Sequence, residues 1–159
     1  FFTNKFWWLL NKMQSRINKE LQELSTNPPE NCAVSLVGDD ITHWRVNLVG
    51  PEGSAYEGGN FELALTIPAN YPFRAPDVRF VTKIYHPNVK SDDGAICTEL
   101  YQSDWSPTKN IRHVLELLLS TLITPSPEHA VEPEIAQQMM NSHEAYVATA
   151  RTWVNQYAR

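Results

Sequence analysis

The chain has 159 residues, enough for one domain whose hydrophobic core needs no disulfide or structural metal. Its formal net charge of −5 provides no basic surface, so we expect no nucleic-acid partner. Its two cysteines and five histidines lack the spacings of a disulfide framework or a zinc site, and no glycine-rich phosphate loop is present. We therefore expect neither a metal nor a cofactor.

The N-terminal residues predict one long helix that ends before Pro28 and Pro29. Its apolar side chains recur every three or four positions, at Phe2, Phe6, Leu9, Met13, Ile17, Leu21 and Leu24. Residues 1–12 precede Met13, a credible native start, so they are either a native apolar extension or a remnant of cloning. Residues 13–159 then form a single core domain.

The apolar run in residues 1–10 is far shorter than the ~20 residues that a membrane span requires. We therefore expect no transmembrane segment. If the extension is helical, Trp7 and Trp8 cannot both face one side of the helix, because adjacent helical residues point in different directions. Both tryptophans should then be partly exposed.

The next part of the chain alternates apolar and polar residues with a period of two, which is typical of half-buried strands. Four strands are predicted, over residues 33–37, 44–48, 61–67 and 78–81. No helical segment separates them, which favours an antiparallel meander. Cys32, at the edge of the first strand, is interpreted as a small buried hydrophobic residue.

Residues 82–106 show little periodicity and predict a long functional loop. A dense apolar stripe from Ile111 to Leu122 then predicts a buried helix that stops before Pro125. Pro133 should open another helix, and Ser142 should cap a last one that runs to about Tyr157.

One motif in the long loop carries chemistry. Cys97 follows a polar turn, Asp92-Asp93-Gly94, and lies downstream of Asn88, whose amide group can donate two N–H bonds. A thiol can accept an acyl group as a thioester, and an amide donor can stabilise the oxyanion that forms when the acyl group moves on.

Several further motifs accompany this one, in a fixed order. They are Gly50-Pro51, Tyr56-Glu57-Gly58-Gly59, Tyr71-Pro72-Phe73, His86-Pro87-Asn88, Trp105-Ser106-Pro107 and Pro125-Ser126-Pro127. From about Ser15 to its end, the chain resembles the ubiquitin-conjugating enzymes. The resemblance implies an α+β fold of the UBC type: an N-terminal helix, a four-stranded antiparallel meander, a catalytic loop and three C-terminal helices.

The resemblance implies that Cys97 is the nucleophile and that Asn88 either stabilises the oxyanion or holds the catalytic loop. Nine positions separate Asn88 from Cys97, one more than is common in the family, and we expect the extra residue in the Asp92-Asp93-Gly94 turn. His86 is interpreted as a buried structural histidine, because no carboxylate or serine accompanies it as an acid–base partner.

Two further residues are expected to support the site. Glu99 corresponds to a family acidic residue beside the cysteine, and His129 occupies a position that is often aspartate in members that modify lysine. A carboxylate there would help to orient or deprotonate an incoming ammonium group. The alternative is that both are solvated loop residues.

By the same resemblance, Phe73 and Pro107 form an apolar ledge for RING or HECT ligases, with Arg16 and Lys19 of the first helix beside it. The alternative for Phe73 is local packing, which the paired Trp105-Ser106-Pro107 motif argues against.

The expected function is to accept ubiquitin from the activating enzyme on Cys97 and to transfer it to a substrate lysine or a ligase cysteine. The alternatives are a carrier of another ubiquitin-like modifier, a non-catalytic ubiquitin-binding scaffold, and an unrelated cysteine hydrolase. A hydrolase would need a histidine base for Cys97, which no motif indicates. The need for a free thiol leads us to expect a cytoplasmic or nuclear protein.

Overall fold

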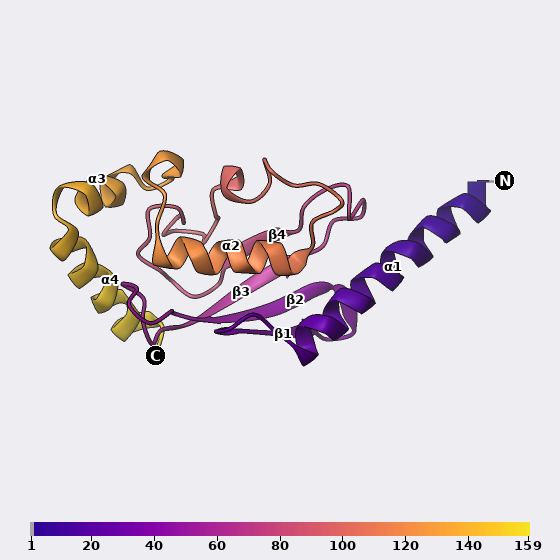
Figure 1. Ribbon diagram of the computed structural model, residues 1–159, viewed down its shortest axis with the longest axis horizontal. Coiled ribbons are helices and arrows are strands. Elements are labelled where there is room, and N and C mark those ends of the chain that lie inside the picture. The colour runs from indigo at the N-terminus through magenta and orange to yellow at the C-terminus, as the bar shows by residue number, and fades with distance from the viewer. Residues whose placement is uncertain (1) are drawn as a thin grey trace.

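The computed structural model describes residues 2–159, with side chains from residue 4 onward. Its first element is the 25-residue helix α1, Phe2–Thr26, which passes through Met13 without a break. One half of α1 packs at the end of the domain and the other half projects beyond it (Figure 1). Trp7 and Trp8 are both largely exposed, as predicted. The division of the chain at Met13 stays a prediction.

The four predicted strands are present and form one antiparallel sheet in the order β1-β2-β3-β4. Their bounds are β1 Cys32–Val37, β2 Asp40–Val49, β3 Asn60–Thr66 and β4 Asp77–Phe80. Trp44, Val46 and Leu48 of β2 are buried and alternate with exposed neighbours, so one face of the sheet carries the core.

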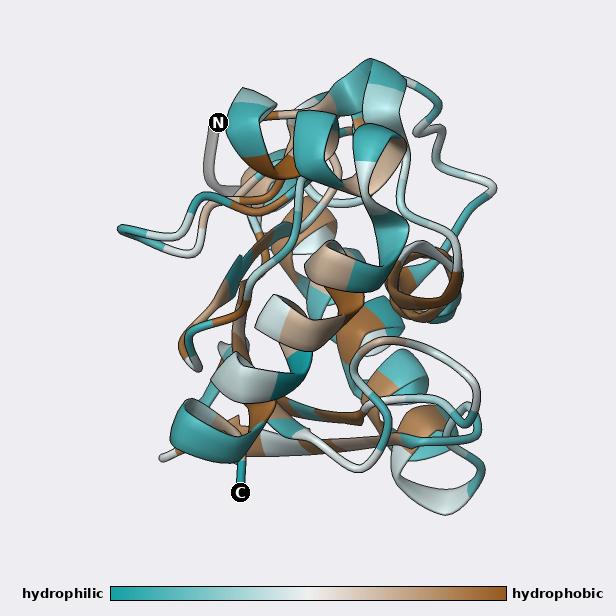
Figure 2. Ribbon diagram, turned by 90° about the vertical axis from the view of Figure 1, so that its left-hand side faces the viewer, coloured by the Kyte–Doolittle hydropathy of each residue, from teal (hydrophilic) through white to brown (hydrophobic). Residues whose placement is uncertain are grey.

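Helix α2, Ile111–Ile123, covers that face of the sheet (Figure 1). Every residue of its predicted apolar stripe is buried. Figure 2 colours the ribbon by hydropathy and shows hydrophobic stretches gathered in the interior of the domain. The side chain of Asn110 caps its first turn by accepting a hydrogen bond from the backbone N–H of His113. The helix ends before Pro125, as predicted.

Two further helices, α3 Pro133–Asn141 and α4 His143–Tyr157, lie at the end of the domain opposite α1 (Figure 1). The predicted cap at Ser142 is wrong in one respect. Ser142 precedes α4, but its hydroxyl makes no capping hydrogen bond and only its carbonyl oxygen accepts one, from the N–H of Tyr146. The helical order agrees with the α+β fold expected from the sequence.

Candidate active site

The segment from His86 to Cys97 folds back on itself as a narrow loop after β4. The backbone N–H of Cys97 donates to the carbonyl oxygen of Asn88 at 3.0 Å, and that of Lys90 donates to Ala95 at 2.8 Å. Between these two bonds, Val89 and Ile96 form an antiparallel bridge. The loop therefore places Asn88 and Cys97 directly opposite each other.

The tip of this loop is the Asp92-Asp93-Gly94 turn, where the extra residue was predicted. Gly94 has a φ of +75°, and a Cβ atom there would lie 1.9 Å from the carbonyl oxygen of Phe80. Its own carbonyl oxygen accepts a hydrogen bond from the N–H of Phe80 at 2.9 Å. Only glycine permits this close approach, which fastens the loop to the end of β4.

The two thiols lie in different surroundings. Cys97 is partly exposed and immediately precedes a short 3₁₀ helix, η1, Thr98–Leu100. Cys32 is buried at the start of β1, and its burial raises the pKa of the thiol to about 11. Cys32 is therefore a neutral core residue at physiological pH, and Cys97 is the thiol that a large acyl donor can reach.

Asn88 is fully buried, and its side-chain amide is occupied by the loop that follows α2. Its Nδ2 donates to the carbonyl oxygens of Ser126 at 2.6 Å and His129 at 2.9 Å, and its Oδ1 accepts from the N–H of Ser126 at 2.9 Å. Both amide hydrogens are thus engaged. In this arrangement Asn88 fixes the 126–129 loop against the cysteine segment.

His86 is fully buried and stacks on Tyr56, with ring centroids 5.3 Å apart. Its Nδ1 accepts from the N–H of Asn88, and its Nε2 therefore carries the proton that it donates to the carbonyl oxygen of Thr121. Loss of hydration lowers the pKa of His86 to about 4. The ring is neutral near pH 7 and orients Asn88 without exchanging protons.

Glu99 and His129 come together across the site. Nε2 of His129 lies 3.6 Å from the Oε2 of Glu99, and Nδ1 of His129 lies 3.1 Å from the hydroxyl of Ser126. Glu99 belongs to η1, next to Cys97, and His129 ends a second 3₁₀ helix, η2, Pro127–His129. The Glu99 side chain is 71% exposed and that of His129 32%, so an incoming amine can reach both.

Sequence reasoning missed Glu132, which holds the loop of residues 86–97 against the segment that follows α2. Its Oε1 accepts from the backbone N–H and the hydroxyl of Ser91, each at 2.9 Å. The carbonyl oxygen of Pro87 also accepts from the N–H groups of Val131 and Glu132. The Pro125-Ser126-Pro127 motif marked the segment after α2, but no sequence pattern indicated the contacts between that segment and the 86–97 loop.

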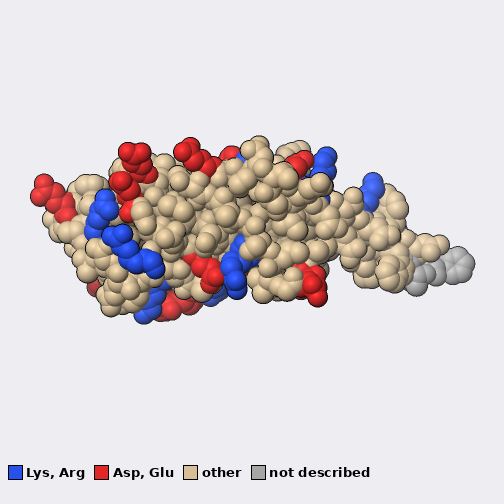
Figure 3. All heavy atoms as spheres, turned by 90° about the horizontal axis from the view of Figure 1, so that it is seen from below, with Lys and Arg blue, Asp and Glu red and all other residues tan. Residues whose placement is uncertain are grey.

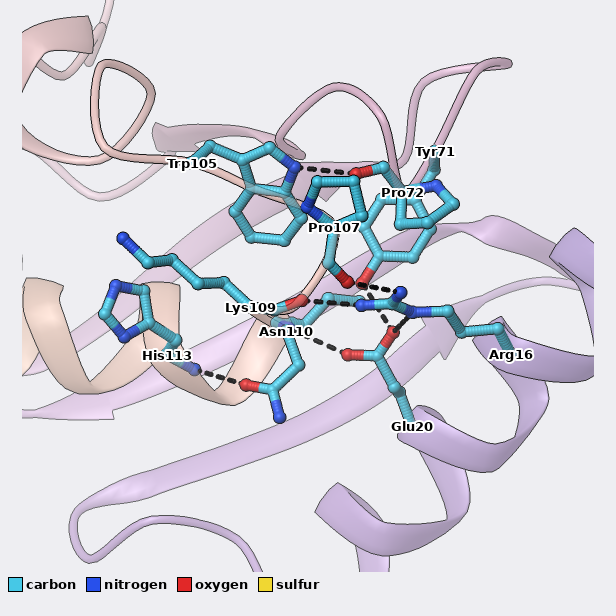
Figure 4. A network of polar contacts seen from close by, with 10 residues as sticks. Arg16, Glu20, Tyr71, Pro72, Trp105, Pro107, Lys109, Asn110 and His113 are labelled. Atoms are coloured by element: carbon cyan, nitrogen blue, oxygen red, sulfur yellow. Dashed lines mark hydrogen bonds and ion pairs between the residues drawn. The ribbon is translucent and has the colours of Figure 1, made fainter.

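Two loops meet α1 beside the expected ligase ledge, and Figure 4 shows Pro72, Trp105 and Pro107 of these loops close to Arg16 of α1. Nε1 of Trp105 donates to the carbonyl oxygen of Pro72 at 2.8 Å, which ties the 105–107 loop to the 71–73 loop. Phe73 is 73% exposed beside this bond, and Pro107 and Lys19 are exposed as well. The side chain of Phe73 therefore does not pack into its own loop.

Arg16 differs from its neighbours, because its guanidinium also makes several bonds within the protein. It donates to the carbonyl oxygens of Pro107 at 2.7 Å and Lys109 at 2.5 Å, and it pairs with Glu20 at 3.2 Å (Figure 4). Arg16 was expected beside the ledge as a contact residue. Its observed bonds hold the 107–109 segment against α1, and its contact with a ligase stays a prediction.

Glu20 is the second residue that sequence reasoning missed. It is buried, and its carboxylate accepts from the Tyr71 hydroxyl at 2.5 Å, from the Ile111 N–H at 2.8 Å and from Arg16. Burial and the hydrogen bond to Glu20 raise the pKa of Tyr71 well above its usual range, so the hydroxyl stays a donor. The only sequence signal was an acidic residue on the buried stripe of the first helix.

Among residues 4–159, no three metal-ligating side chains lie close enough together to hold an ion. Within the described part of the chain, no helix combines the length and apolarity needed to cross a bilayer.

Known proteins are similar to this chain over most of its length. Residues 16–154 match the model of the family described as ubiquitin-conjugating enzyme. The chain is 44% identical over 144 residues to ubiquitin conjugating enzyme E2 B of Dictyostelium discoideum, a match that covers 91% of this chain and 97% of the relative.

Two solved structures resemble the fold. The E2 domain of a Toxoplasma gondii ubiquitin conjugating enzyme has a TM-score of 0.85 and 38% identity, covering 92% of this chain and 99% of that one. A structure described as a ubiquitin conjugating enzyme from Plasmodium yoelii has a TM-score of 0.87 and 36% identity, covering 92% of this chain and 96% of the other.

Proposed function

Because this chain belongs to the ubiquitin-conjugating enzyme family, we propose that Cys97 carries ubiquitin as a thioester between an activating enzyme and a lysine or ligase cysteine. The observation that carries the proposal is the partly exposed Cys97 thiol, set opposite Asn88 and next to the Glu99–His129 pair. Cys32, buried in the core, offers no second acceptor.

In the first step the Cys97 thiolate attacks the carbonyl carbon of the thioester between ubiquitin and the activating enzyme, whose cysteine leaves as a thiolate. One thioester replaces another, so the step needs little driving force. In the second step a neutral lysine amine attacks the Cys97 thioester, loses a proton and forms an amide as the Cys97 thiolate leaves. A ligase cysteine would instead accept the acyl group by a further thioester exchange.

The modifier is tested by charging. The protein is incubated with ATP and an activating enzyme specific for ubiquitin, and in parallel reactions with activating enzymes specific for other ubiquitin-like modifiers. We expect a reductant-sensitive shift in electrophoretic mobility with ubiquitin. A shift with another modifier alone would assign the chain to that modifier, and no shift with any would favour a non-catalytic scaffold.

We propose that ligases bind the ledge formed by Phe73 and Pro107. Replacing Phe73 with alanine should abolish ligase-stimulated transfer and leave thioester formation intact, because truncating an exposed aromatic anchor costs ~2 kcal/mol or more of binding free energy. The comparison is between charging and ligase-stimulated discharge of the same protein. Met140→Ala, which truncates a similarly exposed side chain on α3, is the matched control. Normal ligase affinity of Phe73→Ala would refute the ledge.

His129 is proposed to limit the reaction with lysine. A lysine amine has a reference pKa of about 10.4, so a second carboxylate beside Glu99 would attract its ammonium form and assist its deprotonation. His129→Asp should speed discharge to free lysine roughly fivefold, the effect of about 1 kcal/mol from one half-exposed charge pair. Discharge to free cysteine, whose reference pKa is about 8.5, should change little.

The control for this variant is His129→Asn, which has the size of aspartate without its charge and should not speed the lysine reaction. Single-turnover discharge of the isolated thioester measures both acceptors. The unchanged protein could instead discharge rapidly to lysine, and His129→Asp could leave that rate unaltered. This outcome would show that Glu99 alone is enough to assist the lysine amine, and it would remove the proposed role of His129.

We also propose that the protein works in the cytoplasm or nucleus. Both of its cysteines are free thiols, and the proposed reaction requires Cys97 to stay reduced. Detection of the protein by fractionation or imaging would test this proposal, and residence in an oxidising compartment would contradict it.

A further inference from the structure

The projecting half of α1 contains a segment that is apolar in every direction. Residues 6–10 are Phe6, Trp7, Trp8, Leu9 and Leu10. At 3.6 residues per turn, five consecutive side chains surround the whole helix axis. Phe6 is 63% exposed, Trp7 61% and Trp8 54%, so each of these three side chains is more than half exposed. Helices that are apolar all round are found in apolar surroundings rather than in water.

A groove on one side of this segment does not account for all of it. The groove has a volume of about 960 Å³ and lies between the projecting helix and the Pro72–Phe73 loop. Phe6, Trp8 and Leu10 line it, whereas Trp7 does not. A protein segment bound in the groove would leave Trp7 exposed. A partner that contacts only one face of the helix would therefore not cover the whole apolar segment.

The charged side chains in this part of the chain are all positive. The first 19 residues contain four cations, at Lys5, Lys12, Arg16 and Lys19, and no acidic residue, whereas the other 140 residues contain all 18 acids and nine cations. Figure 3 shows the projecting end without a carboxylate on the visible face. Lys12 places its ammonium group 4.1 Å from the centre of the Trp8 ring. The surface that complements this charge is anionic.

We propose that residues 5–12 bind the surface of an anionic lipid bilayer. The apolar side chains would enter the boundary between headgroups and acyl chains, and Lys5 and Lys12 would contact lipid phosphates. Tryptophan favours this boundary because its ring is apolar and its N–H can donate to a polar group. The contact proposed for residues 5–12 is with the bilayer surface and does not cross the bilayer.

The test is co-sedimentation of the full chain with vesicles of phosphatidylcholine alone or of phosphatidylcholine mixed with phosphatidylserine. We expect binding to the mixed vesicles that is more than tenfold stronger than binding to neutral ones, since each cation near an anionic surface contributes roughly fivefold. Trp7→Ala/Trp8→Ala should reduce binding to the mixed vesicles more than tenfold, and so should Lys5→Gln/Lys12→Gln.

Two matched variants carry the same kinds of change elsewhere and should bind the mixed vesicles normally. Met140→Ala truncates an exposed apolar side chain on α3, and Lys83→Gln removes an exposed cation far from α1 in sequence. Circular dichroism and thioester loading should be unchanged in all four variants, because the altered side chains lie outside the core and the proposed active site.

Three outcomes would overturn the proposal. They are absence of binding to either kind of vesicle, binding that does not depend on the tryptophans, and equal binding to neutral and anionic vesicles. Light scattering without lipid gives an independent check. A dimer that the tryptophan variant abolishes, together with no binding to either kind of vesicle, would assign the apolar segment to contact between copies of the chain.

Discussion

Cys97→Ala is expected to abolish thioester formation, since no other thiol can accept the acyl group. Cys32 is buried, and burial raises the pKa of its thiol to about 11, so it supplies almost no thiolate at pH 7. Charging is measured as a mobility shift that reductant removes. An unchanged shift in Cys97→Ala would overturn the assignment of the nucleophile.

Two further variants test whether the bond between Cys97 and ubiquitin is a thioester. Cys97→Ser should accept ubiquitin slowly, as an oxyester that reductant does not cleave, because a hydroxyl replaces the thiol at the same position. Cys32→Ala should charge like the unchanged protein, since it removes the other sulfur without touching the catalytic loop.

Asn88→Ala should load ubiquitin but discharge it to free lysine roughly 100-fold more slowly, the loss expected when one oxyanion donor is removed. A second cause acts in the same direction. Without the Asn88 amide, the backbone groups of Ser126 and His129 that it now satisfies lose their partners, at about 1–3 kcal/mol for each unsatisfied group. Single-turnover discharge measures the first effect, and denaturant unfolding measures the second.

The two measurements separate the roles that the sequence left open. Slow discharge with a lowered free energy of unfolding and weaker hydrogen-exchange protection of residues 126–129 would show that Asn88 acts by positioning that loop. Slow discharge with unchanged stability would show that the amide turns to an oxyanion during the reaction. Normal discharge would contradict both roles, and equal loss of loading and discharge would make Asn88 a purely structural residue.

The elements of this fold could be predicted because each one depends on a local pattern. The alternation around Trp44 and Leu63 marks strands with one buried face, and the spacing from Ile111 to Leu122 marks a helix with one buried stripe. The cap of α4 could not be read in this way. A serine before a helix permits a side-chain cap, but the backbone angles at Ser142, φ −149° and ψ 76°, accompany a hydroxyl that makes no capping bond.

The residues of the site could be predicted individually, but their contacts could not. The position of Asn88 follows from a motif, whereas its bonds to Ser126 and His129 join residues about forty positions apart. Arg16 was expected beside the ledge, but its bonds to two carbonyl oxygens more than ninety positions away were not foreseen. Such contacts depend on how α1, α2 and the loops pack together, and no periodicity in the sequence records that packing.

The carboxylate of Glu20 connects residues beside the ledge, so a mutation of one of them affects the others. It binds the side chains of Arg16 and Tyr71 and the first N–H of α2, so three separate segments share one acceptor. Substitutions at Arg16 and Tyr71 should therefore be non-additive, because each disturbs the surroundings of the other. A weakened ligase response in an Arg16 variant would report a displaced loop as readily as a missing contact, and a double-mutant cycle with Tyr71 is what distinguishes the two.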